Sequence, residues 1–156
     1  MLRKQFSGAM QTRNDCHSDK LTYVRGAAFC GDQLLQDSDL ERYFGKVNDV
    51  QGFARAVKCL NGFFVVVLQR GTEIFAAVDC IRSIPLYYVI DGDSLYISDD
   101  ANWIKAFTIA DVPECLTSVE FLLTGYVTGS DTLCPGVFQI QAGELLTASM
   151  SSEPIC

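Results

Sequence analysis

The clearest set of catalytic side-chain types lies near the start of the chain, where Asp15, His17 and Ser18 supply all three members of a serine-type triad. Triads assemble from distant segments, because near neighbours in sequence cannot converge on one proton-transfer line. We therefore expect no catalysis at this position. No GxSxG, Walker or GxGxxG motif occurs either, so the esterase, nucleotidase and dinucleotide-binding classes have no supporting motif.

A second candidate is the segment AAVDCIRSIPLYY (residues 76–88), in which the pair Asp79-x-x-Arg82 interrupts two apolar stretches. A structural role is favoured: Asp79 and Arg82 can pair across a tight connection, and Pro85 can open the next strand where no ladder hydrogen bond is needed. Ser83 would be a nucleophile only with a base in reach, and the sequence places none nearby.

Cysteines are the remaining nucleophiles, and there are seven of them. The closest pair, Cys16 and Cys30, is 14 positions apart, and no CxxC motif occurs. An odd number without an export signal favours a reducing compartment, so we expect a cytoplasmic protein whose cysteines mostly fill the core. With one histidine and no clustered ligands, we expect neither a metal nor another cofactor.

Composition limits the class of protein and its partners. Of the 156 residues, 49% are hydrophobic and only 4 are proline, which indicates one globular domain over residues 1–156, with residues 1–20 and 149–156 loosely held. The net charge of -7 disfavours nucleic acid and anionic membrane surfaces. The longest strongly apolar run, residues 63–68, is too short to cross a bilayer.

Residue patterns predict the elements that would position these side chains. A first strand is expected over residues 23–30, followed by two amphipathic helices over 39–44 and 49–60 on one side of a sheet. Four strands should then form an antiparallel meander, with Gly and Asp residues in the hairpin turns 70–72 and 91–93; the strands are 63–69, 73–79, 85–90 and 94–98.

The strand at 63–68 lacks polar alternation and should be covered on both faces. Helices are expected from 98–100 to 107 and over 117–123, the second ending at Gly125. Short strands joined at Pro135-Gly136 and Ala142-Gly143 should complete the domain.

Four blocks in the same order resemble the N-terminal glutaminase-like domain of the asparagine synthase family: residues 60–69, 76–88, 95–100 and 125–146. The resemblance covers residues 23–148. It implies an α+β fold of the N-terminal-nucleophile hydrolase type, a four-layer αββα sandwich of two antiparallel sheets flanked by helices. The family's synthetase half, with its Ser-Gly-Gly-x-Asp-Ser motif, has no counterpart, so we expect no adenylate-forming activity from this chain.

In that family an N-terminal cysteine attacks the glutamine amide, whereas this chain begins Met1-Leu2. The resemblance matches Cys30-Gly31-Asp32 to the family's oxyanion-hole Asn-Gly-Glu, with the asparagine donor replaced, and Asp49 to the aspartate that holds the substrate amino group. Loss of one oxyanion donor typically costs about 100- to 1,000-fold in rate. Cys16 as a processed N-terminus would leave too short a segment before Gly31 for the family's arginine loop.

The sequence therefore predicts an inactive glutaminase-like domain that works by binding. Its expected partner is a separately encoded synthetase-like protein or a second copy of itself, with Asp79, Arg82 and Tyr87 as contacts implied by the resemblance. A small amide or amino acid held near Cys30, Gly31, Asp32 and Asp49 is a further option. The alternative is a residual glutamine amidohydrolase or amidotransferase that uses Cys30 or Cys16.

Overall fold

The computed structural model describes residues 2–5, 20–108 and 116–149, which form a mixed α+β protein. Contacts divide the chain into two compact units. The five-stranded unit contains residues 20–84 and 142–149, and the four-stranded unit contains residues 2–5, 85–108 and 116–141. The expected single domain stays a prediction.

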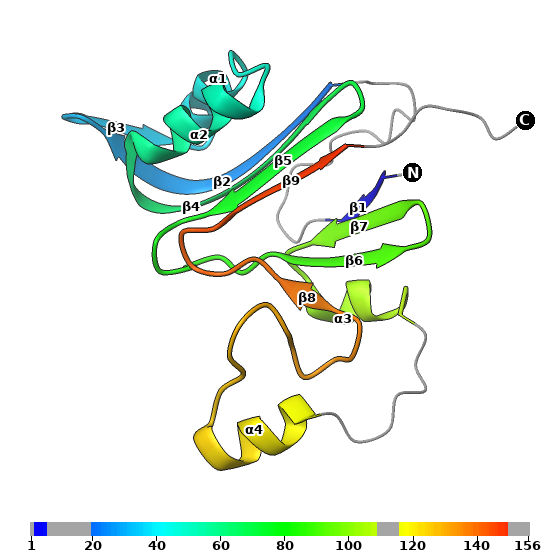
Figure 1. The fold of residues 1–156 in the computed structure, drawn as a ribbon. Helices are drawn as coiled ribbons and strands as arrows, with labels where there is room; N and C mark the ends of the chain where they lie inside the picture. Colours follow the sequence, from blue (N-terminus) through cyan, green and yellow to red (C-terminus); the bar gives the residue numbers. More distant parts are fainter. Residues whose placement is uncertain (1, 6–19, 109–115, 150–156) are drawn as a thin grey trace, which may run out of the picture. The chain divides into compact units, whose positions relative to one another are not determined.

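The five-stranded unit is an antiparallel sheet in the order β3-β2-β4-β5-β9, covered on one face by α1 and α2 (Figure 1). Its elements are β2 (Lys20–Cys30), β3 (Gln33–Gln36), α1 (Ser38–Phe44), α2 (Val50–Lys58), β4 (Leu60–Arg70), β5 (Glu73–Val78) and β9 (Leu145–Ser149). The two helices predicted on one side of a sheet are confirmed. Phe44 and Phe53 from the helices pack against Phe64 and Phe75 from the strands in one buried cluster.

The central position of β4 explains its continuous apolar sequence. It pairs with β2 from Lys20↔Arg70 to Cys30↔Leu60, and with β5 on its other edge. Residues 64–68 are all buried, as the absence of polar alternation predicted, whereas Phe63 is exposed. The β2 and β4 backbones approach closely at Gly62, where a Cβ would lie 2.4 Å from the carbonyl oxygen of Ala27, so only glycine fits.

The four-stranded unit has the strand order β1-β7-β6-β8. Its strands are β1 (Leu2–Gln5), β6 (Tyr87–Asp91), β7 (Ser94–Ser98) and β8 (Phe138–Gln139), and its helices are α3 (Ala101–Lys105) and α4 (Leu116–Thr124). The β1 strand runs parallel to β7, and the other pairs are antiparallel. Asp100 caps α3 by accepting a hydrogen bond from the Asn102 N–H at 2.9 Å, as the Ser98-Asp99-Asp100 segment predicted.

The predicted four-strand meander is wrong at its middle connection. Its outer hairpins form, with Gly71 (φ 59°) and Gly92 (φ 53°) in the turns, but β5 pairs with β4 and β9, while β6 pairs with β7 and β8. The chain therefore leaves one sheet after β5 and enters the other at β6. Apolar strands in sequence order predict a meander, but here β5 and β6 each pair with a strand distant in sequence, β9 and β8 respectively.

Candidate functional site

The loop that follows β5 is organised by Asp79, which is buried with 2% of its surface exposed. Its Oδ2 accepts the backbone N–H of Phe64 at 3.1 Å, and its Oδ1 accepts that of Ile81 at 2.9 Å. The Ser83 N–H, at 3.1 Å from Oδ2, and the Ser83 hydroxyl also donate to this carboxylate. Three backbone donors and one hydroxyl are thus satisfied by one side chain, as buried carboxylates require.

Backbone atoms of Asp79 extend the same network. Its carbonyl oxygen accepts the N–H of Arg82 at 3.0 Å and that of Gly143 at 2.9 Å, which ties the segment before β9 to the end of β5. Arg82 adopts a positive φ of 53°, an uncommon conformation for a residue with a side chain. Asp79 therefore has a structural role in this loop, and its partners are Ser83 and backbone groups that no sequence pattern pointed to. The expected side-chain pair of Asp79 with Arg82 stays a prediction.

The three predicted contact residues do not share one environment. Asp79 is buried, Arg82 is half-buried in the same loop, and Tyr87 is a half-buried residue of β6 in the four-stranded unit. Asp79 can influence a contact surface only through the loop that it holds, because its own side chain is inaccessible.

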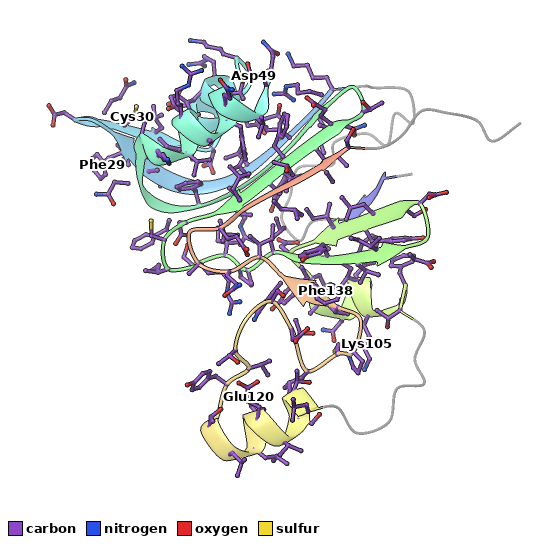
Figure 2. All side chains as sticks on the ribbon, in the orientation of Figure 1. Phe29, Cys30, Asp49, Lys105, Glu120 and Phe138 are labelled. Atoms are coloured by element: carbon purple, nitrogen blue, oxygen red, sulfur yellow. The ribbon has the colours of Figure 1, made fainter. Side chains whose placement is uncertain are left out.

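The predicted ligand residues Cys30 and Asp49 are not brought together. Asp49 caps the start of α2, where its Oδ1 accepts the Gly52 N–H at 2.7 Å. Cys30 pairs with Leu60, which follows the other end of α2. A helix of nine residues spans about 13 Å at 1.5 Å per residue, so the two side chains lie at opposite ends of it (Figure 2).

Gly31 and Asp32 form the exposed turn between β2 and β3, and Gly31 has a φ of 60°. The positive φ explains why glycine occupies this turn without any appeal to an oxyanion. Asp32 is exposed, so of the predicted pocket residues only Cys30 has a partly enclosed side chain.

Cys30 lies against Tyr43 of α1, and both pack on the buried cluster beneath the helices. The Tyr43 hydroxyl donates to the carbonyl oxygen of Ala56 at 3.1 Å. Burial raises the pKa of Tyr43 to about 12, and a hydrogen bond with the Cys30 thiol and the nearby Cys59 contribute in the same direction. The two cysteines therefore have a common tyrosine neighbour.

Arg70, at the end of β4, is a structural residue that the sequence analysis missed. Its Nε donates to the Val47 carbonyl at 2.7 Å, and its Nη2 to the Phe44 carbonyl at 3.1 Å, near the C-terminus of α1. Its Nη1 donates to the Leu21 carbonyl at 2.7 Å, in the neighbouring strand. Burial lowers the pKa of Arg70. The guanidinium fork joins α1 to two strands, a geometry that lysine cannot reproduce.

The most unusual surface belongs to α4, which turns its apolar side toward solvent. Leu116, Leu122 and Leu123 are 82%, 83% and 81% exposed, and Val119 is also exposed. At 100° per residue these four side chains form one stripe, whereas the buried residue of the helix is Thr117. We call Leu116, Val119, Leu122 and Leu123 the α4 stripe. The sequence predicted a helix over residues 117–123 from its start and stop residues, without indicating what its apolar side faces.

A shallow pocket of about 190 Å³ lies in the four-stranded unit. Its lining comes from β6, the segment after α3 and the Pro135-Gly136 turn, and none of Cys30, Gly31, Asp32 and Asp49 contributes to it. Within the described residues, no three His, Cys, Asp or Glu side chains gather as metal ligands. Asp15, Cys16, His17 and Ser18 lie outside the described part of the chain.

Comparison with protein-family models gives no match, and comparison with curated proteins gives no significant match. No helix in the described ranges has the length and apolar character needed to span a membrane. The class that the structure defines is a mixed α+β protein with two sheets and four helices in its described part.

Proposed function

We propose that this chain is a glutaminase-like domain of the asparagine synthase family that works by binding a protein, with the α4 stripe as its contact surface. The observation that carries the binding role is the outward apolar face of α4. The family assignment is supported by the four sequence blocks and is compatible with the two-sheet α+β architecture.

The size of the stripe suits a protein contact. With roughly 180 Å² for a fully exposed leucine side chain, its four residues expose on the order of 500 Å² of apolar surface, at the upper end of what monomeric proteins show. Tyr126 and Leu133, from the segment after α4, are also exposed. When Tyr126 and Leu133 are added to the α4 stripe, the exposed apolar area approaches the roughly 800 Å² that each partner buries in a standard interface.

We propose a second copy of the chain as the occupant. Only one charged residue, Glu120, occurs in α4, although the whole chain carries a net charge of -7. Its Oε1 accepts hydrogen bonds from the Thr128 N–H, at 3.3 Å, and the Thr128 hydroxyl. Two α4 stripes can therefore meet without like charges in the contact, and a two-fold axis would make the interface self-complementary.

Light scattering coupled to size-exclusion chromatography tests this proposal. The native chain should elute as a dimer at micromolar concentration, and the double variant Leu122→Gln/Leu123→Gln should elute as a monomer. Glutamine leaves the net charge unchanged, so repulsion cannot cause the difference. Ile90→Gln is the matched control, because Ile90 is 66% exposed but lies in β6 outside the stripe; it should remain dimeric.

A native chain that is monomeric throughout would refute self-association. If it then bound a purified synthetase-like domain, and only the α4 variant lost that binding, the occupant would be the synthetase-like partner instead.

Calorimetric titration with glutamine and asparagine tests the small-ligand option. Ammonia release from glutamine, compared between the native chain and Cys30→Ser, tests the alternative of a residual amidohydrolase; loss of activity in the variant would establish it.

A further inference from the structure

Two cysteines far apart in sequence become neighbours where β2 ends and β4 begins. The Cα of Cys30 is paired with that of Leu60, and Cys59 is the residue immediately before Leu60, at the C-cap of α2. The Leu60 Cα lies about 5 Å from the Cys30 Cα and about 3.8 Å from the Cys59 Cα, so the Cys30 and Cys59 Cα atoms are at most about 9 Å apart. Disulfides usually join Cα atoms 4.4–6.8 Å apart.

Side chains also converge at this point. Cys30 is on the face of β2 that packs beneath the helices, since it contacts the same buried cluster as Tyr43. Tyr43 is hydrogen-bonded to Cys30 and has Cys59 as a further neighbour. The tyrosine hydroxyl also reaches the carbonyl of Ala56, three residues before Cys59 in the last turn of α2. Cys30 therefore lies next to the Tyr43 hydroxyl group, and Cys59 is close enough to influence the pKa of that tyrosine.

Accessibility differs between the two thiols in a way that suits stepwise oxidation. Cys59 is exposed, whereas Cys30 is half-buried. An oxidant in solution can reach Cys59 directly, and Cys30 is placed to react with the product. The pair thus combines an accessible thiol with a nearby resolving thiol, the arrangement found in redox-sensitive sites.

We propose that Cys30 and Cys59 form a thiol pair that closes to an intramolecular disulfide on exposure to a hydroperoxide. The Cys59 thiolate attacks one peroxide oxygen, the O–O bond breaks, and a sulfenic acid and one water form. Cys30 sulfur then attacks the sulfenic sulfur, the S–O bond breaks, and the disulfide and a second water leave. Two electrons from the sulfurs reduce one hydrogen peroxide, and the two thiol protons end in water.

The disulfide would connect the end of β2 to the junction of α2 and β4, and it would displace the thiol that is hydrogen-bonded to Tyr43. It would close a loop that contains both helices, α1 and α2. Oxidation should therefore raise the melting temperature of the five-stranded unit. This inference is independent of the proposed binding role, because neither cysteine belongs to α4.

Peptide mapping of the full chain tests the inference. The fully reduced protein is treated with an equimolar amount of hydrogen peroxide, alkylated and digested with trypsin without reduction. Cleavage after Arg25, Arg42, Lys58 and Arg70 places each cysteine alone in its peptide, in residues 26–42 and 59–70. Before alkylation, we expect the intact mass to fall by about 2 Da, and after digestion these two peptides should be the main linked pair.

Two controls make the test specific. Oxidation in concentrated guanidinium chloride should spread Cys30 over its six possible partners, because the pairing depends on the fold. Cys59→Ser should abolish the linked peptide, whereas Cys80→Ser, at another exposed cysteine, should leave it unchanged. The proposal is overturned if folded protein shows no enrichment of the Cys30–Cys59 pair over unfolded protein, or if Cys30 pairs mainly with another cysteine.

Discussion

Replacement of Asp79 by alanine should destabilise the five-stranded unit strongly, because the carboxylate is the shared acceptor of a buried network. The backbone N–H groups of Phe64, Ile81 and Ser83 would lose their acceptor together. A hydrogen bond to a charged group contributes about 1.5–3 kcal/mol, and an unsatisfied buried donor costs about 1–3 kcal/mol. Since Phe64 N–H is fully buried and the other two are part-buried, we expect a total loss of about 3–5 kcal/mol.

Urea unfolding followed by far-UV circular dichroism measures this loss, and hydrogen exchange locates it. The amides of Phe64, Ile81 and Ser83 should lose protection in Asp79→Ala, along with that of Gly143, whose acceptor is the Asp79 carbonyl. Asp79→Asn should lie between the native chain and the alanine variant, since one acceptor oxygen remains.

Asp32→Ala is the matched control, because Asp32 is an exposed aspartate in a turn of the same unit. Its effect should stay within about 0.5 kcal/mol. A loss below about 1 kcal/mol in Asp79→Ala, or unchanged protection of the Phe64 amide, would refute the assigned role of the carboxylate.

Three other predictions concern the same unit. Arg70→Met should lower the free energy of unfolding by about 2–3 kcal/mol in urea denaturation, and Arg70→Lys should recover only part of it, because lysine cannot reach both α1 and the neighbouring strand as a fork. The pKa of Tyr43 is raised to about 12 from 10.0, so between these pH values the folded state keeps the tyrosine proton while the unfolded state loses it. The contribution of the protonated Tyr43 to the free energy of unfolding is therefore complete below about pH 10 and is lost as the pH rises through about 12. The free energy of unfolding of Tyr43→Phe, measured against pH, should lack this part of the pH dependence. A pH profile identical to that of the native chain would contradict the prediction. Gly62→Ala should cost about 1–3 kcal/mol because its Cβ would collide with the β2 backbone; a melting temperature equal to the native one would contradict that close approach.

Much of the local structure could be predicted from the sequence. Helical spacing of Phe53 and Ala56 placed α2, and the unbroken apolar run of β4 indicated a strand covered on both faces. Glycines in the hairpin turns were recognisable because a positive φ is easily adopted only without a side chain. These features depend on neighbours within a few residues, so the sequence carries them directly.

The candidate site was less predictable, because its residues are linked through pairing between distant strands. Cys30 and Asp49 looked like members of one pocket by resemblance, but α2 separates them. The Cys30–Cys59 neighbourhood was invisible in the sequence, where 29 positions separate the two, and only the β2–β4 register brings them together.

The sequence by itself predicted most of the strands and helices of this protein and the turns at 70–72 and 91–93, but not β1 or β3. Tertiary structure alone decided that β5 and β6 enter different sheets, that Arg70 connects α1 to the sheet, and that the apolar side of α4 faces solvent. The physical reason is that hydrophobic periodicity identifies an apolar face without naming what covers it. Hydrogen bonds between residues far apart in sequence, such as those from the Phe64 N–H to the Asp79 carboxylate and from the Gly143 N–H to the Asp79 carbonyl, help to select the final arrangement.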